Sequence, residues 1–338
     1  MGFFGRLFGN KEEHAPKDEE VERMMARVID LSPRLRMAQG HEARLRVAIG
    51  QAALHLRALV AEFPSARDLS PASWASDSYI RAFFGAADDV APALGRSTEL
   101  SGLFERQPGL LEAYAVLGMA MNERRTLGVA QEGGVLRSDV AQTTVSFSDH
   151  QIRICGATEA ELRQEILRRM VDQLAIEALA GIAADTARRD DLEQERALVA
   201  ARLRLLGRQG IGMQSVLGGD AEVDAGELAR LRAQREENDM ALKSLGSRSE
   251  ALDRQLERMC EVFADARKLI RVTRTSLRLS RMNVVLAEQG EEDGHTLDLE
   301  IARVPGDPPS ERAFALVKVA RVEVPKPRNL LDEAARLL

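Results

Sequence analysis

Aromatic residues and cysteines are scarce in this chain. Phe, Trp and Tyr together make up only 4% of the 338 residues, with one tryptophan and two tyrosines. So small a share disfavours a β-sandwich or an aromatic-lined ligand pocket and suits helix–helix packing. Two cysteines, Cys155 and Cys260, are too few for a disulfide framework, so we expect a reducing compartment.

Long apolar runs are missing as well. A membrane-spanning helix needs about 18 uninterrupted apolar residues, and the best candidate, 174–184, is short and contains Glu177. The N-terminus lacks the apolar region of a secretory signal. We therefore expect a cytoplasmic protein, whose membrane contact would be peripheral and on the inner face of a membrane.

Motifs of catalysis and metal binding are also lacking. No Gly-x-Ser-x-Gly occurs, the glycine-rich stretch 207–219 lacks the ending of a phosphate loop, and the five histidines show no metal-ligand spacing. Ser148, Asp149 and His150 are neighbours in sequence, which does not give a triad its geometry. We expect no cofactor, no metal and no catalytic residue.

Helical signals dominate the chain from residue 21 to about 134. Ser32-Pro33 and Ser70-Pro71 each place a capping residue before a proline that suits the first helical turn. Apolar residues recur at three or four positions across 45–63, which predicts a helix ended by proline. Shorter helices are expected after Ser70, Ser97 and Gln107. The last of these helices would carry Leu110, Leu111, Tyr114, Leu117 and Met121.

A period of two replaces this pattern in two later regions. Alternation over 143–148 and again over 152–154, around Asp149-His150, predicts a hairpin with its turn at those two residues. Leu277 and Leu279, then 295–304 and 312–324, predict three further strands. Residues 135–157 and 274–325 would thus form one small antiparallel β unit.

The segment between these strands, 158–273, has the pattern of two long helices. Thr158 with Glu161, and later Asp224 with Glu227, are capping boxes, and glycines at 207–219 would form the tip between the helices. The second helix has a seam with alternating spacings of three and four residues, which predicts an antiparallel coiled coil and leaves pairing between two chains open. The seam comprises Leu228, Leu231, Asn238, Leu242, Leu245, Leu252, Leu256 and Met259, with the polar Arg235 and Ser249 between them.

The fold class expected from these signals is α+β and mainly α. A peptide and linker, 1–20, precede a helical domain, 21–134. The β unit follows, with the coiled-coil hairpin inserted between its strands, and an amphipathic tail, 326–338, ends the chain.

The N-terminal peptide has the pattern of an interfacial membrane helix. Apolar side chains would gather on one side of it, with basic residues available to lipid phosphates. These residues are Phe3, Phe4, Arg6, Leu7, Phe8 and Lys11. The Phe/Leu-Phe-Gly pattern resembles the short N-terminal membrane anchor of ESCRT-III proteins, in this peptide only. Packing onto the protein itself or onto a protein partner is the alternative.

A basic run crosses the end of the second long helix and enters the strand after it. It comprises Arg267, Lys268, Arg271, Arg274, Arg278 and Arg281. Such a run could meet nucleic acid or anionic lipid, or pair with local carboxylates on a solvated face. The chain carries a net charge of −6, and few aromatics interleave the run, so nucleic acid is not the expected partner.

These features predict a non-enzymatic scaffold or adaptor. Its coiled-coil arm would mediate self-assembly or bind protein partners, and its N-terminal peptide would attach it to an anionic membrane surface. A nucleic-acid-associated factor using the run 267–281, or an enzyme of unrecognised type, are the alternatives.

Overall fold

The computed structural model describes residues 18–132, 135–217, 225–247, 250–287, 293–306 and 308–325. The fold is mixed helix and sheet, with an antiparallel sheet, as the sequence predicted. The chain forms two compact units. Unit 1 comprises Gly50–Leu174 and Asp265–Leu338, preceded by Met1–Val21, and unit 2 comprises Glu22–Ile49 and Ala175–Ala264. The domain limits given above stay predictions.

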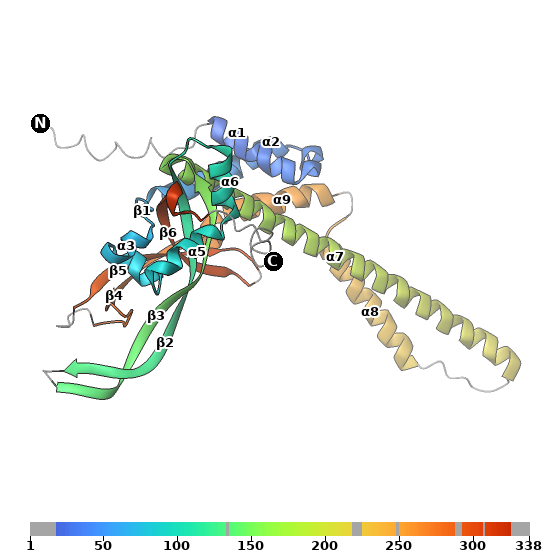
Figure 1. The fold of residues 1–338 in the computed structure, drawn as a ribbon. Helices are drawn as coiled ribbons and strands as arrows, with labels where there is room; N and C mark the ends of the chain where they lie inside the picture. The colour runs from blue at the N-terminus through green and yellow to red at the C-terminus, as the bar shows by residue number, and fades with distance from the viewer. Residues whose placement is uncertain are drawn as a thin grey trace, which may run out of the picture. The chain divides into compact units, whose positions relative to one another are not determined.

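The elements follow one another in chain order as labelled in Figure 1. The α-helices are α1 (Asp18–Leu31), α2 (His41–Ala61), α3 (Pro71–Ser76), α4 (Ser78–Phe83), α5 (Val90–Gly95), α6 (Thr98–Arg106), α7 (Glu159–Leu217), α8 (Ala225–Ser244), α9 (Ala251–Ala264) and α10 (Ala266–Leu269). The strands are β1 (Arg67–Asp68), β2 (Glu112–Glu132), β3 (Val135–Gly156), β4 (Arg271–Leu279), β5 (His295–Val304) and β6 (Ser310–Ala320). Short 3₁₀ helices occur at η1 (Pro33–Met37), η2 (Ala87–Asp89) and η3 (Arg321–Glu323).

Unit 1 is built on a sheet with the strand order β3-β2-β6-β5-β4, antiparallel throughout, and β1 joins it by parallel pairing with β6. Strands β4, β5 and β6 confirm the three predicted later strands. Only residues 112–119 of β2 pair with β6. Residues 120–132 pair with β3, which also bonds to 283–285 through Thr143 and Val145. Beyond those bonds the two strands continue as a two-stranded ribbon (Figure 1).

Both faces of this sheet are buried. On one face, Leu117 and Met119 pack with residues of α4, α5 and α6, among them Phe84 and Leu100. On the other face, Leu316 packs with residues from the end of α2 and the start of α7. A sheet covered by helices on both faces needs apolar side chains at successive positions of its central strands.

This two-sided burial overturns one prediction. The helix expected to carry Leu110 to Met121 is wrong, because residues from Glu112 onward form β2. Ala113 and Ala115 face one core, while Tyr114 and Val116 face the other. An apolar run that is buried on both sides shows no period of two, and a spacing of three or four arises in it by chance.

The hairpin predicted at 143–155 is also wrong. β3 runs through Asp149-His150 without a turn and pairs with β2. The register shifts here, since Gly118 faces Gln151 while Ala120 faces Ser148, so two residues of β3 oppose one of β2. This is a β-bulge. Asp149, where the sequence predicted a turn, has a positive φ of 49° within the strand.

Hydrogen bonds hold the bulge. Arg312 on β6 donates Nη1 to the Asp149 carboxylate at 2.8 Å and Nη2 to its backbone oxygen at 2.5 Å. Gln151 donates to both carboxylate oxygens, at 2.8 and 2.9 Å. The hydrogen bond from Gln151, and to a smaller extent that from Arg312, lowers the pKa of Asp149 below its usual value.

The predicted start of α7 is confirmed and its predicted end is wrong. Thr158 Oγ1 accepts a hydrogen bond from the Glu161 backbone nitrogen at 3.2 Å, which is the first half of the capping box. The Glu161 carboxylate accepts its bond from the backbone nitrogen of Ala157, one residue before the cap, at 3.0 Å. The helix was expected to end before the glycine-rich tip at 207–219, but it continues to Leu217. Isolated glycines within a helix cost only about 1 kcal/mol each against alanine, so they need not end it.

The second long helix is interrupted where the sequence predicted continuity. α8 ends at Ser244 and α9 begins at Ala251. Gly246, with a φ of 72°, ends α8 in the left-handed conformation that glycine adopts without strain.

Unit 2 has a core of its own. Leu45 and Ile49 of α2 are fully buried, as are Leu256, Met259 and Phe263 of α9, against which η1 lies. Among the described residues, no helix is both long enough and apolar enough to cross a membrane.

Candidate functional site

A hairpin of two helices in unit 2, here called the arm, is the first candidate. It comprises residues 190–206 of α7 together with α8. Across it, Asn238 donates to Glu195 Oε2 at 3.2 Å, and Arg196 pairs with Asp239 at 3.3 Å. Arg189, earlier in α7, bonds to Leu245 and Gly246, later in the chain, so the two helices are antiparallel neighbours.

The predicted seam of α8 and α9 has mixed burial. Four of its members are buried, namely Leu231, Asn238, Leu256 and Met259. Four others are half-buried, namely Leu228, Leu242, Leu245 and Leu252. Arg235 is exposed, and Ser249 lies outside the described residues. Buried Asn238, bonded to Glu195, is a polar group that favours one helix register over its neighbours.

Arg189 of α7 binds the backbone of the segment between α8 and α9. Its Nη2 donates to the carbonyl oxygens of Leu245, at 2.5 Å, and Gly246, at 2.9 Å. These carbonyls close the C-terminal end of α8, where backbone oxygens lack helical partners. Ser247 adds a bond from its backbone nitrogen to Glu250 at 3.1 Å.

Large apolar side chains also lie on the outside of the arm. Leu198 is 60% exposed, Leu205 is 59% exposed and Met240 is 60% exposed, whereas Val199 beside them is buried. The sequence analysis missed these residues, because it followed a single seam. Leu198 and Leu205 are seven residues apart, so one heptad spacing outside the seam was the available signal.

The basic run 267–281 does not form one surface. Alternation along β4 places Arg274 and Arg278 on one face of the sheet and Arg271 on the other. Lys268 pairs with Asp265 at 2.7 Å, Arg274 pairs with Glu300 at 2.7 Å, and Arg278 donates to the Ala287 oxygen at 2.7 Å. Arg267 and Arg281 are exposed.

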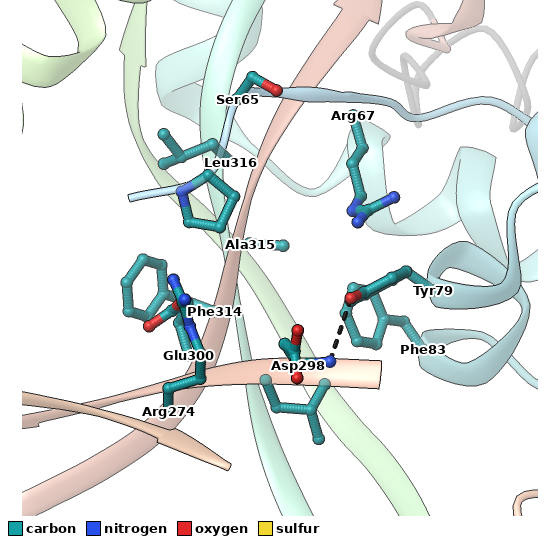
Figure 2. Close-up of a pocket in the computed structure, with 12 residues that line it drawn as sticks. Ser65, Arg67, Tyr79, Phe83, Arg274, Asp298, Glu300, Phe314, Ala315 and Leu316 are labelled. Atoms are coloured by element: carbon teal, nitrogen blue, oxygen red, sulfur yellow. Dashed lines mark hydrogen bonds and ion pairs between the residues drawn. The ribbon is translucent and has the colours of Figure 1, made fainter. Parts of the chain in front are cut away.

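The second candidate is a pocket of about 360 Å³ in unit 1 (Figure 2). It lies where β5 and β6 part, because their pairing ends at Glu300 and Phe314 and β1 pairs with β6 beyond that point. Tyr79 of α4 bridges the gap, and its hydroxyl oxygen accepts a hydrogen bond from the Asp298 backbone nitrogen at 3.0 Å.

Two paired arginines face each other across this pocket (Figure 2). The Arg67 guanidinium lies 3.5 Å from the centre of the Tyr79 ring and pairs with Asp77 at 3.2 Å. On the opposite side, Glu300, with a side chain only 9% exposed, is bonded by Arg274, and this bond raises the pKa of Arg274.

Each of these cations is thus matched by a carboxylate. With Asp298 also in its lining, the pocket is a polar slot whose two arginines are both paired. Apart from Arg274, its charged side chains were not singled out by the sequence analysis, since they come together only through the pairing of β1 with β6.

Both cysteines carry thiols of low reactivity. Burial raises the pKa of Cys155 to about 12, and burial also raises the pKa of Cys260. The thiolate is the reactive and metal-binding form, so neither side chain suits nucleophilic chemistry at neutral pH. In the part of the chain that the structure describes, no group of three or more His, Cys, Asp or Glu side chains is placed to hold a metal ion.

The predicted membrane-binding residues, Phe3 to Lys11, lie outside the described residues, and so does the tail 326–338.

His150 holds the end of α4 against the sheet. Its Nε2 donates to the Phe83 oxygen at 2.8 Å, and its ring stacks on Phe84 with centres 4.3 Å apart. Asn283, at a φ of 58°, donates to the neighbouring Ala82 oxygen at 2.8 Å. Burial lowers the pKa of His150, against the opposing effect of the bond to Phe83.

A pH dependence follows from this lowered pKa. The unfolded chain binds a proton at higher pH than folded His150 does, so stability is full above about pH 6.5 and is lost as pH falls from there toward the folded pKa. Burial lowers the pKa of His55 in the same direction. His150→Gln, which keeps a donor for Phe83, should flatten this loss in urea unfolding at pH 7 and 5. An unchanged slope would contradict the assignment.

No protein-family model, curated protein or solved structure matches this chain.

Proposed function

We propose that this chain is a non-enzymatic scaffold that assembles through its arm. The observation that carries the proposal is the set of three exposed apolar side chains, Leu198, Leu205 and Met240, outside the seam that holds the arm together. Full burial of such side chains is worth about 1.5–3 kcal/mol each. Exposed side chains at heptad spacing on a helix fit a further helix as partner.

The rest of the architecture supports an assembly role. The arm is an antiparallel coiled coil that the chain inserts between β3 and β4, and its length exceeds what the sheet needs for a core. Buried Asn238 favours a fixed register, which an assembly element needs. The paired arginines of the unit 1 pocket and the protonated thiols offer little to catalysis.

The N-terminal peptide would attach the assembled scaffold to an anionic membrane surface. A single short anchor binds weakly and reversibly. Assembly links several anchors, and linked anchors bind far more strongly than one alone. The nucleic-acid-associated factor and the enzyme stay alternatives.

Sedimentation velocity tests the assembly role. A variant with Leu198→Ser, Leu205→Ser and Met240→Ser should lose the self-association of the full chain. The matched control changes three apolar residues that are exposed in unit 1, by Leu111→Ser, Leu127→Ser and Val322→Ser. It should associate as the native chain does. A full chain that stays monomeric at high concentration would overturn the proposal.

Liposome co-sedimentation tests the membrane role. The full chain should sediment with vesicles that contain anionic lipid, and a chain lacking residues 1–11 should remain in solution. Equal binding by both chains would remove the membrane part and leave the assembly part standing.

A further inference from the structure

Charge is segregated along the arm into two blocks. The block 190–195 with 236–241 contains only acidic charges: Asp190, Asp191, Glu193, Glu195, Glu236, Glu237 and Asp239. The block 196–206 with 225–235 contains six arginines and a single acidic residue, Glu227. Those arginines are Arg196, Arg202, Arg204, Arg230, Arg232 and Arg235.

Among the described residues, folding of the hairpin pairs only Arg196 of the basic block with a carboxylate. The contacts of Glu195 with Asn238 and of Arg196 with Asp239 fix the level of each helix against the other. In that alignment Arg202 lies level with Arg232, and Arg204 with Arg230, so like charges lie at the same level of the arm. Like charges on neighbouring positions destabilise a helix pair.

Within the described part of the arm, the arginines beyond the boundary between the blocks make no ion pair with a carboxylate. Arg196 pairs with Asp239 at that boundary. Arg202, Arg204, Arg230, Arg232 and Arg235 make no ion pair with another residue in the described ranges. A partner that brings carboxylates to this block would relieve the repulsion, and the acidic block of a second arm carries the matching charge.

We infer that two copies of this chain pair through their arms, antiparallel, with the basic block of each on the acidic block of the other. This inference rests on the proposed assembly function and names its partner. The contact is isologous, because one patch meets the same patch across a two-fold axis. A closed pair results, not an open filament.

The exposed apolar side chains place the axis near Leu198. Met240 lies at the level of residue 194 of its own arm. A two-fold axis at Leu198 places that level beside Arg202 of the second copy. Met240 is there level with the interval between Leu198 and Leu205 of that copy. The contact thus has an apolar centre, flanked on both sides by opposite charges, which set orientation and register.

Charge inversion on full-length chains tests the pairing. One variant inverts the basic block by Arg202→Glu, Arg204→Glu and Arg232→Glu. The other inverts the acidic block by Asp190→Lys, Asp191→Lys and Glu237→Lys. All six side chains are exposed, so both variants should keep native circular dichroism. Each alone should dimerise roughly 100-fold more weakly than the native chain, because most of the charge attraction between the blocks is then removed.

The decisive step of this experiment is to mix the two variants. A one-to-one mixture of the two variants should restore dimerisation, since the unchanged acidic block of one variant then meets the unchanged basic block of the other, and 1 M salt should weaken it. Variants that dimerise alone as the native chain does, or a mixture that stays monomeric, would overturn the antiparallel pairing. If the serine variant still abolishes association in that case, the assembly function stands while the charge pairing fails.

Discussion

Replacing Phe84 by alanine is expected to lower the free energy of unfolding of unit 1 by about 3–5 kcal/mol. The side chain is only 1% exposed and is among the largest that are fully buried. It stacks on His150, and its backbone oxygen accepts a hydrogen bond from Trp74 Nε1 at 2.9 Å. The truncation leaves a cavity between α4 and the sheet that the surrounding helices cannot fully close.

Trp74 makes this prediction simple to measure. It is the only tryptophan of the chain and packs against the same core, so its fluorescence reports the unfolding of unit 1 in urea. Leu111→Ala is the control, since Leu111 is 76% exposed, and it should change the stability by less than about 0.5 kcal/mol. A Phe84→Ala loss as small as that of the control would show that the core is not packed as described.

Replacing Arg163 by alanine is expected to lower the stability of unit 1 by about 3 kcal/mol. Its guanidinium donates to the carbonyl oxygens of Val60 at 2.6 Å, Phe63 at 3.0 Å and Pro64 at 3.1 Å, and pairs with Glu159 at 2.7 Å. These carbonyls close the C-terminal end of α2. Alanine removes this donor from all three oxygens, and Val60 keeps only the weaker bond from the Phe63 backbone nitrogen at 3.3 Å.

Arg169→Ala is the matched control for this change. Arg169 lies on the same helix, and its ion pair with Glu165, at 2.9 Å, is exposed to solvent. It should cost less than about 0.5 kcal/mol. Arg163→Lys should recover only part of the loss, since one ammonium cannot replace the planar fork that reaches three carbonyls. Equal effects of Arg163→Ala and Arg169→Ala in urea unfolding would contradict the capping role.

Local signals predicted those elements whose ends are set by neighbouring residues. Ser70 accepts a bond from the Ser73 backbone at 3.0 Å and starts α3, and Ser97 accepts one from Leu100 at 3.0 Å and starts α6. The strand expected at 295–304 is β5. Caps and alternating faces act within a few residues, so a sequence displays them directly.

The signals failed where distant contacts decide. β2 was taken for a helix because helices cover both faces of the sheet, and Asp149-His150 was taken for a turn because a bulge needs the same backbone conformation. The pocket of unit 1 has no local sequence signature, since Arg67 and Glu300 come to opposite sides of it only when β1 pairs with β6. The charge blocks of the arm are visible in sequence, but their apposition follows only from the helix alignment that Glu195 and Asn238 fix.

Distances between spin labels on the two arms of a dimer test the antiparallel pairing most directly. Labels are placed one at a time at the exposed positions Ala197, Arg204 and Asp191, by substitution to cysteine in a chain whose Cys155 and Cys260 are replaced. The pairing predicts the shortest distance at Ala197. The separation along the arms should grow by about 3 Å for each residue away from Leu198, because each copy moves 1.5 Å in opposite directions. The same distance at all three positions, or no coupling between chains, would contradict it.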